Sequence, residues 1–308
     1  MDRRAGQAGA GRDAVTPLLV PLPAGYRVAD VLAFHARDTQ GVAEQVSADG
    51  FRKGVMLHGV PVVYDVMFDA STARATLLTD GAHATALFDT ARAALPGMLG
   101  LLIDPAPFAA AVAGDALFGP LVARTPGLRI VQSASVFEAL SWAIIGQQIN
   151  LSFAIALRRT LILQAGRRHS SGLWCYPEAA DVAALPPAAL TAHKFSRAKA
   201  DTLLRLAQLL VTGALSLERA APVDDMAAQL LAIKGIGPWT VNYARLRGYG
   251  DADCSLHGDG AVRTALQRLL GEPDKPTMAR TQALLAQYAP HRTMAAAYLW
   301  HSLAAETD

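Results

Sequence analysis

The stretch LLAIKGIGPWTVNY, residues 230–243, decides how the rest of the chain is interpreted. Gly235 and Gly237 interrupt an apolar helical pattern, and Pro238 follows where the first turn of a helix tolerates proline. The pattern predicts a helix, a tight hairpin and a second helix. Backbone N–H groups at the start of the second helix, together with the helix dipole, can bind a phosphate. The alternative is an ordinary turn between helices, which a lone GxG pattern favours.

Length and composition indicate a globular protein of more than one domain. The 308 residues contain no run of about 18 apolar residues, so no membrane-spanning segment is predicted. A formal charge of +2 permits a polyanionic partner without requiring one. Two cysteines, Cys175 and Cys254, cannot supply a four-thiolate zinc or iron–sulfur site, and the cytoplasm is the simplest compartment. Residues 1–16 lack the apolar core of a secretion signal, and we expect a disordered tail there.

Residues 17–104 have the pattern of a small α+β domain. Partly alternating segments separated by turn residues predict an antiparallel meander, with strands at residues 42–47, 51–59, 60–70 and 73–79. One helix is expected at about residues 28–38, and another at residues 82–95, where Pro96 and Gly97 mark its end. The sequence of this domain indicates no chemistry.

Residues 105–308 predict an all-helical body in which no convincing strand recurs. Ser135 and Glu138 form a Ser-x-x-Glu capping box before an apolar helix that extends to Ile149. Further helices are expected at residues 152–165, 196–211, 225–233, 239–246, 260–270, 277–288 and 293–304, with Gly248 capping the second helix of the hairpin. The fold class is therefore α+β: an N-terminal antiparallel sheet with helices, then a mainly α-helical body containing a helix-hairpin-helix motif at residues 230–247.

Three amide side chains, Gln147, Gln148 and Asn150, lie at the break between two of these predicted helices. Amides at a helix junction usually satisfy backbone groups that lack helical partners. The other interpretation, equally favoured by the residues, is that this corner of the fold faces a groove or a ligand.

The hairpin LLAIKGIGPWT and the aspartate in HGDGAVRTAL, Asp259, together resemble the helix-hairpin-helix Gly/Pro-Asp superfamily of base-excision DNA glycosylases. Gly237 and Asp259 are 22 residues apart, which suits one helix, a loop and the start of another helix. Three segments in order, IIGQQINLSFA (144–154), GIGPWTVNYARLRG (235–248) and APHRTMAAAYLWHS (289–302), resemble the bacterial 3-methyladenine DNA glycosylase II branch. The likeness covers the helical body, and the branch also carries an N-terminal α+β domain with an antiparallel sheet.

Asp259 is the candidate catalytic residue. Cleavage of an N-glycosidic bond builds positive charge on the deoxyribose, and a carboxylate beside the sugar stabilises that charge or activates the attacking water. Asp259 also stands at the predicted start of a helix, so the residues alone equally support a role as N-cap. The resemblance places it at the family's catalytic position.

The resemblance also implies how the hairpin is used. The DNA-binding residues of the hairpin would be Lys234, Gly235, Ile236, Gly237 and Thr240. A structural sodium or potassium ion is implied at the main-chain carbonyls of Leu231, Ile233 and Gly235. Carbonyl groups leave no signature in a sequence, so this cation site is an expectation from the resemblance alone.

A wedge and a base pocket are implied as well, because a base must leave the duplex before it can be excised. Gln148, with Ile149 beside it, occupies the wedge position, where the family's better-known residue is leucine. The aromatic pocket would be lined by Trp239, Tyr243, Trp300 and Phe34, although aromatic residues at helical spacing more often belong to a core. An electron-rich pocket suits alkylated purines, which carry positive charge and gain about 0.5–2 kcal/mol from a cation–π contact.

Trp239 occupies the position where bifunctional members of the superfamily carry the lysine that attacks the sugar and leads to strand cleavage. We therefore expect a monofunctional hydrolase that leaves an abasic site. The resemblance implies no required cofactor, and its partner would be double-stranded DNA containing damaged bases. We expect a cytoplasmic, nucleoid-associated monomer with no membrane contact.

Two departures from the family pattern border the predicted pocket. His257 and Gly258 precede Asp259 where Pro-Asp or Asp-Asp is common, and His301 follows Trp300 where tyrosine is common. Both could alter which damaged bases are accepted. The alternatives are a non-catalytic helix-hairpin-helix DNA-binding module, in which Asp259 is only a cap, and a glycosylase for another lesion such as hypoxanthine or uracil.

Overall fold

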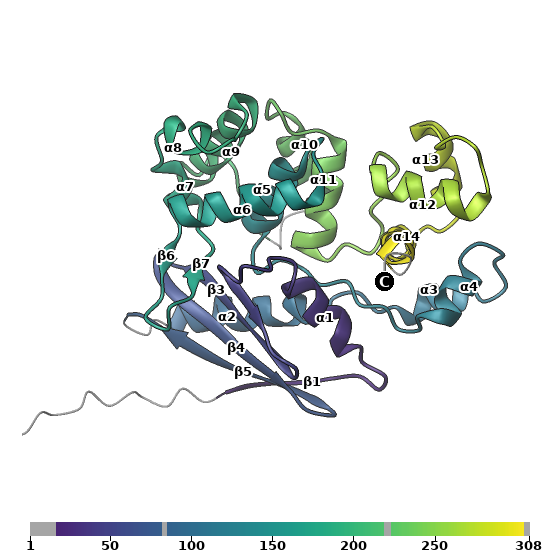
Figure 1. The fold of residues 1–308 in the computed structure, drawn as a ribbon, viewed down its shortest axis with the longest axis horizontal. Coiled ribbons are helices and arrows are strands. Elements are labelled where there is room, and N and C mark those ends of the chain that lie inside the picture. The colour runs from purple at the N-terminus through teal and green to yellow at the C-terminus, as the bar shows by residue number, and fades with distance from the viewer. Residues whose placement is uncertain (1–16, 82–84, 219–222, 305–308) are drawn as a thin grey trace, which may run out of the picture.

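The computed structural model describes residues 17–81, 85–218 and 223–304, and Figure 1 shows their arrangement. The N-terminal part is a five-stranded antiparallel sheet in the order β1-β5-β4-β3-β2. Its strands are β1 (Leu18–Pro21), β2 (Glu44–Val46), β3 (Gly50–Leu57), β4 (Val60–Phe68) and β5 (Thr72–Thr79). Strands β2 to β5 are neighbours in chain order, which confirms the predicted meander, whereas β1 was not predicted. The predicted tail at residues 1–16 lies outside the described residues.

Two helices, α1 (Val28–His35) and α2 (Thr85–Met98), pack against this sheet. The fully buried Tyr64 of β4 donates its hydroxyl to the carbonyl oxygen of Ala91 in α2, at 3.2 Å. The prediction that α2 ends at Pro96 is wrong, because the helix continues to Met98. Proline removes one helical hydrogen bond, and the full burial of Met98 holds the last turn in place.

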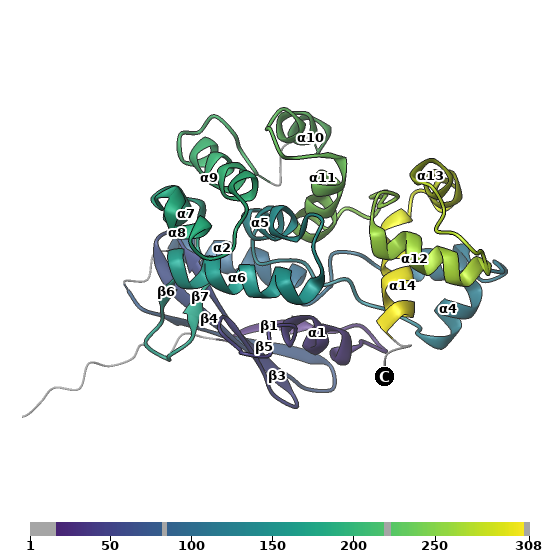
Figure 2. The same ribbon diagram turned by 45° about the horizontal axis from the view of Figure 1, so that its top comes forward.

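The rest of the chain is mainly helical, as predicted, and Figure 2 shows α5 to α11 above the sheet with α12 to α14 beside them. The helices are α3 (Ala106–Ala111), α4 (Gly119–Arg124), α5 (Val136–Gly146), α6 (Leu151–Ala165), α7 (Ala179–Ala183), α8 (Pro187–Thr191), α9 (Arg197–Val211), α10 (Val223–Leu231), α11 (Pro238–Ala244), the π-helical turn η1 (Arg245–Tyr249), α12 (Gly260–Leu270), α13 (Met278–Ala286) and α14 (Arg292–Ala304). Among the described residues, no helix has the length and apolar character that crossing a membrane requires.

A short second sheet contradicts the prediction that no strand follows residue 105. Strands β6 (Arg167–Arg168) and β7 (Trp174–Cys175) pair with each other, and Tyr176 next to them exchanges backbone hydrogen bonds with β3. Gly54 of β3 permits this contact, since a Cβ atom there would lie 2.2 Å from the carbonyl oxygen of Trp174. Two-residue strands are too short to leave an alternating pattern in the sequence.

The second helix of the hairpin does not end at Gly248, as the sequence predicted. It continues through η1, and the chain turns at Gly250, whose φ is +72°. Gly248 instead allows close packing, because a Cβ atom there would lie 3.2 Å from the Cα of Val136 in α5. This contact fixes η1 against α5 beside the hairpin.

The predicted capping box of α5 is half right. Ser135 accepts a hydrogen bond from the backbone N–H of Glu138 at 3.0 Å, but the Glu138 carboxylate does not return a bond to Ser135. It accepts from the backbone N–H of Ala134 instead, at 2.9 Å. Its other oxygen lies 2.7 Å from Lys53 and 3.0 Å from Arg158, both buried. The helix also ends earlier than predicted, at Gly146.

Glu44 completes a buried cluster of two carboxylates and two cations between the sheet and the helical body. It pairs with Lys53 at 2.7 Å and with Arg158 at 3.1 Å. Burial opposes the ionisation of Glu44, yet Arg158, Lys53 and the hydrogen bond with His35 hold its pKa well below the ordinary value. The cluster therefore joins β2 and β3 to α6 and, through Glu138, to α5.

Candidate active site

The hairpin between α10 and α11 requires glycine at one of its two predicted positions. Gly235 has a φ of +94°, and a Cβ atom there would lie 2.2 Å from the hydroxyl oxygen of Thr202 in α9. Gly237 is extended, and the space beside it is open. Lys234 and Gly235 are exposed, whereas Ile236 and Thr240 are buried. The exposed face of the hairpin is therefore mainly backbone with one cationic side chain.

The loop between α5 and α6 is tied to this hairpin by Gln147. Its amide nitrogen donates to the carbonyl oxygen of Gly235 and to the hydroxyl of Thr240, both at 2.9 Å. Asn150 caps α6 by accepting from the backbone N–H of Phe153. Gln148 between them is exposed and has a φ of +55°, the left-handed region that disfavours side chains. Gln147 and Asn150 thus form hydrogen bonds with neighbouring groups, whereas Gln148 is exposed.

The predicted cation site at Leu231, Ile233 and Gly235 stays a prediction. The Gly235 carbonyl already accepts the Gln147 amide, and the Ile233 carbonyl accepts the backbone N–H of Ile236 at 3.0 Å. A carbonyl oxygen has two lone pairs, so each oxygen keeps one for an ion. The residues present are therefore compatible with a cation.

Asp259 is both the N-cap of α12 and the acceptor of two indole groups. Its Oδ1 accepts from the backbone N–H groups of Ala261 and Val262, each at 2.9 Å. The same oxygen accepts Nε1–H of Trp300 at 3.1 Å, and Oδ2 accepts Nε1–H of Trp239 at 2.9 Å. The residue is 8% exposed. The capping role and a buried, oriented carboxylate therefore coexist in one residue.

The aromatic residues predicted for the pocket lie together beside this carboxylate. The ring centroids of Trp239 and Tyr243 are 5.4 Å apart, and those of Tyr243 and Trp300 are 6.3 Å apart. Phe34, from α1, joins them through Arg247, whose guanidinium carbon lies 4.9 Å from the Phe34 ring and 5.5 Å from the Trp300 ring. Four segments that are distant in sequence meet at this place.

Two arginines at this site were missed in the sequence. Arg37 lies 3.6 Å from the Phe34 ring, on which Arg247 also lies, and 5.3 Å from the Trp142 ring. Burial lowers the pKa of both arginines, and Tyr243 partly offsets the effect. Arg247 stands inside the segment GIGPWTVNYARLRG and could have been singled out there. Nothing in the sequence marked Arg37.

Trp239 donates its indole N–H to Asp259 and carries no primary amine that could attack a sugar. Lys199 donates to the carbonyl oxygen of Ile145 at 2.6 Å, and Lys234 is exposed on the hairpin. Neither of these lysines is paired with Asp259 in the described part of the chain. The described residues also contain no group of three or more His, Cys, Asp or Glu side chains that could hold a metal ion.

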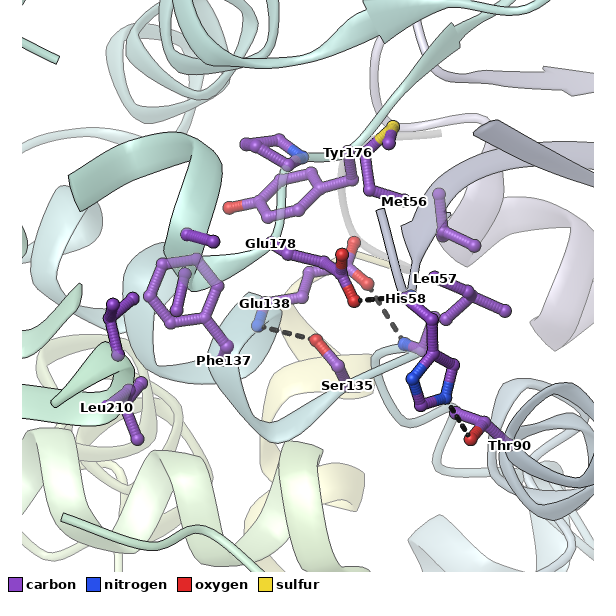
Figure 3. A pocket seen from close by; sticks show the side chains of 16 residues that line it. Met56, Leu57, His58, Thr90, Ser135, Phe137, Glu138, Tyr176, Glu178 and Leu210 are labelled. Carbon is purple, nitrogen blue, oxygen red and sulfur yellow. Dashed lines mark hydrogen bonds between the residues drawn. The ribbon is translucent and has the colours of Figure 1, made fainter. Parts of the chain in front are cut away.

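A cavity of about 380 Å³ lies away from Asp259, between β3, α2, α5, α7 and α9, and Figure 3 shows it from close by. Its lining is mainly apolar and includes Phe137 and Leu210. At one end Glu178 accepts the backbone N–H of His58 at 2.9 Å, and the His58 ring lies 2.8 Å from the Thr90 hydroxyl. None of the predicted site residues lines it, so this cavity is separate from the candidate active site.

Comparison with known proteins agrees with this geometry. Residues 141–291 match the family described as HhH-GPD superfamily base excision DNA repair protein. YfjP of Bacillus subtilis (strain 168) is 31% identical over 179 residues, which cover 58% of this chain and 62% of that protein. DNA-3-methyladenine glycosylase 2 of Escherichia coli (strain K12) is 30% identical over 186 residues, which cover 60% of this chain and 64% of that protein. The chain thus spans less than two thirds of each of these relatives.

The fold has a known counterpart in the 3-methyladenine DNA-glycosylase from Archaeoglobus fulgidus. The two structures superpose with a TM-score of 0.76 over 92% of this chain and 97% of the other. At 19% sequence identity, this likeness concerns the fold alone. The sequence match and the hairpin with its aspartate agree with the predicted resemblance: residues 141–291, just under half of the chain, match the HhH-GPD superfamily of base excision DNA repair proteins.

Proposed function

We propose that this protein is a monofunctional DNA glycosylase that hydrolyses the N-glycosidic bond of alkylated purines, of the 3-methyladenine and 7-methylguanine type, in duplex DNA. The observation that carries the proposal is the buried carboxylate of Asp259, which accepts indole N–H groups from Trp239 and Trp300. A residue that only caps α12 needs the backbone N–H groups of the first turn. Donors from two other helices add nothing to capping, and they favour catalysis over a binding module.

In the proposed reaction, a water oxygen bonds to C1′ of the deoxyribose as the bond from C1′ to the base nitrogen breaks. The electron pair of the broken bond leaves with the base, so a positively charged purine departs as a neutral molecule, and the attacking water gives one proton to the solvent. Asp259 stabilises the positive charge that the sugar carries during this step. The two indole groups keep its carboxylate oriented.

The base enters the site after leaving the stack, and Gln148 fills the place it vacates. Its exposure and left-handed backbone support this role, since a strained residue that points outward at a loop is a candidate for function. Gln147 keeps the loop next to Gly235 and Thr240 while Gln148 inserts. Ile149 is half-buried beside it.

The product is an abasic site with an intact strand, because Trp239 supplies no amine for attack on the sugar. The chemistry uses water and protein groups, so we expect activity without an added cofactor. One chain supplies the hairpin, the loop and Asp259, and we therefore propose that a monomer is active on double-stranded DNA.

A neutral lesion such as hypoxanthine is a second candidate substrate. Arg37 and Arg247 both lie against the Phe34 ring, and Arg247 also lies 5.5 Å from the Trp300 ring. Two desolvated cations disfavour a third positive charge nearby. A panel of single-lesion duplexes with 3-methyladenine, 7-methylguanine, hypoxanthine and uracil separates these substrates. Faster release of hypoxanthine than of either methylated purine would favour the neutral lesion.

Replacement of Asp259 by asparagine tests the proposal itself. Asparagine caps a helix as well as aspartate does but carries no charge. We expect the variant to fold and to lose base release from methylated duplex DNA. Undiminished release by Asp259→Asn would refute the catalytic role, and an inactive wild-type protein that still binds DNA would support the binding module.

A further inference from the structure

The first turns of α9 are fixed to both elements that are proposed to meet DNA. Lys199 donates to the carbonyl oxygen of Ile145 at the end of α5, at 2.6 Å. The hydroxyl of Thr202 lies 3.2 Å from the carbonyl oxygen of Lys234 in the hairpin. The start of α9, and with it the loop that precedes this helix, is therefore held next to the hairpin and the end of α5.

A cavity of about 350 Å³ opens between α6 and this loop before α9. Its polar lining consists of Arg159 and Thr160 from α6 and His193 and Lys194 from the loop. Phe153 closes one end, and its backbone N–H is bound by Asn150, two residues after Gln148. Phe153 stands five residues after Gln148, in the first turn of α6.

Positive charge around this cavity is only partly compensated. Lys194 lines the cavity, and Arg197, the first residue of α9, follows three residues later outside the lining. Both are exposed, and neither forms an ion pair within the residues that the structure describes. Arg159 pairs with Asp38 through one nitrogen, while its buried Nε has no hydrogen-bond partner there. Asp201, one turn after Arg197, is exposed and is likewise not paired with it. Two full charges and part of a third remain available.

Lys194 has a left-handed backbone, with a φ of +72°. It follows the end of α8, where the backbone N–H of His193 donates to the carbonyl oxygen of Leu190 at 3.0 Å. Glycine or asparagine is the usual residue at such a helix end, because a side chain is strained there. A long cationic side chain at this place therefore points to a use for the charge.

We propose that Arg159, His193, Lys194 and Arg197, called here the α9 cluster, bind a backbone phosphate of the DNA duplex outside the flipped nucleotide. The inference rests on the proposed function, since it takes DNA as the partner. Lysine and arginine beside a concave surface are the groups that neutralise DNA phosphates. With Lys234 on the hairpin, cations then lie on two sides of Gln148, and the duplex is held on both sides of the vacated position.

The test compares three charge-removing variants that stand on the same loop and helix: Lys194→Gln, Arg197→Gln and the control Arg205→Gln. Arg205 is exposed on α9 two turns beyond Arg197 and outside the cavity. Affinity for a short duplex with a tetrahydrofuran abasic analogue is measured against salt concentration. We expect the slope of log affinity against log salt to fall by about 1 for each of the first two variants and to stay unchanged for the control.

A second measurement separates this inference from the proposed function. Base release by saturating enzyme in a single turnover should be the same in the control Arg205→Gln and in wild type, because Arg205 belongs neither to the α9 cluster nor to the candidate active site. Wild-type salt slopes in Lys194→Gln and Arg197→Gln would overturn the phosphate site and leave the glycosylase proposal standing. An equal fall of the salt slope in all three variants would also overturn the phosphate site, since it would indicate a diffuse positive field and no specific site. A wild-type protein without base release would instead refute the proposed function.

Discussion

The indole nitrogen of Trp300 lies 3.1 Å from Oδ1 of Asp259, a residue 41 positions earlier in the chain. This hydrogen bond joins α14 to the start of α12 and approaches the same carboxylate that Trp239 approaches from the hairpin. The hairpin and the C-terminal helix are thereby brought to one carboxyl group. An error in the position of either helix would displace the proposed catalytic oxygen atoms.

Replacement of Trp300 by phenylalanine should slow base release. The ring stays, the donor to Asp259 is lost, and a hydrogen bond to a charged group contributes about 1.5 kcal/mol or more, so a decrease of about tenfold is expected in the single-turnover rate. Trp174→Phe on β7 is the matched control, because Trp174 lies at the short second sheet. A Trp300→Phe enzyme as fast as the Trp174→Phe enzyme would show that the indole does not orient Asp259.

Most of the fold could be predicted because it follows local patterns. Strand β5 alternates between buried and more exposed residues, and α9 and α12 are amphipathic. Ser135, Asn150 and Ser196 cap α5, α6 and α9, and Asp259 caps α12 at the expected residue. The errors occur where tertiary contacts override local preference. Glycine is common at the end of a helix, but Gly248 instead lets Val136 approach η1 closely.

The site could be predicted in part. The residues near the hairpin were found because the two glycines and the proline, together with Asp259, resemble an ordered family pattern. Arg37 was not found, since its place beside Trp142 and Arg247 depends on how the chain after α1 packs against α5, and a single arginine in the turn after a short helix has no distinguishing signal. Gln147 and Gln148 look alike in sequence. Only their backbone angles and hydrogen bonds separate the tied amide from the exposed one.

The two glycines of the hairpin should respond differently to alanine. Gly235→Ala places a Cβ atom 2.2 Å from Thr202 at a φ of +94°, and the left-handed backbone alone costs about 1–2 kcal/mol of unfolding free energy. Gly237→Ala meets open space at an extended φ and should cost less than about 1 kcal/mol. Urea denaturation of both variants measures the difference. Equal destabilisation would mean that the close approach to Thr202 is not what selects glycine.

Gln148→Gly should stabilise the protein and impair its activity. Relief of the left-handed conformation returns about 1–2 kcal/mol and exceeds the entropy cost of glycine, about 0.5–1 kcal/mol, while the proposed wedge is lost. Thermal denaturation and single-turnover base release are measured together. His58→Gly, which relieves a similar strain at the cavity away from Asp259, should keep the wild-type single-turnover rate. A Gln148→Gly enzyme with undiminished release would exclude Gln148 as the wedge.

The buried charge cluster should make stability depend on acid pH. The pKa values of Glu44 and Glu138 are lowered in the folded protein, so their contribution is present above the ordinary glutamate value of about 4.3 and is lost as pH falls through the lowered values. The pKa of His35 is lowered chiefly by burial, which adds a loss that begins below about pH 6.5. The free energy of unfolding from urea titrations should therefore decrease steadily from pH 7 to pH 3.

Lys53→Met should destabilise the protein at neutral pH and weaken this dependence. The variant leaves Glu44 and Glu138 with Arg158 as their shared cation, and removal of one partner from a buried pair costs about 3–5 kcal/mol. The acid-induced loss should also become smaller, because both carboxyl pKa values rise towards the ordinary glutamate value when Lys53 is absent. Arg52→Met on the same strand is the control: its partner Asp65 is one-third exposed, and such a pair contributes less than about 1 kcal/mol. Similar costs for the two variants would mean that the buried cluster adds no more to stability than a surface ion pair does.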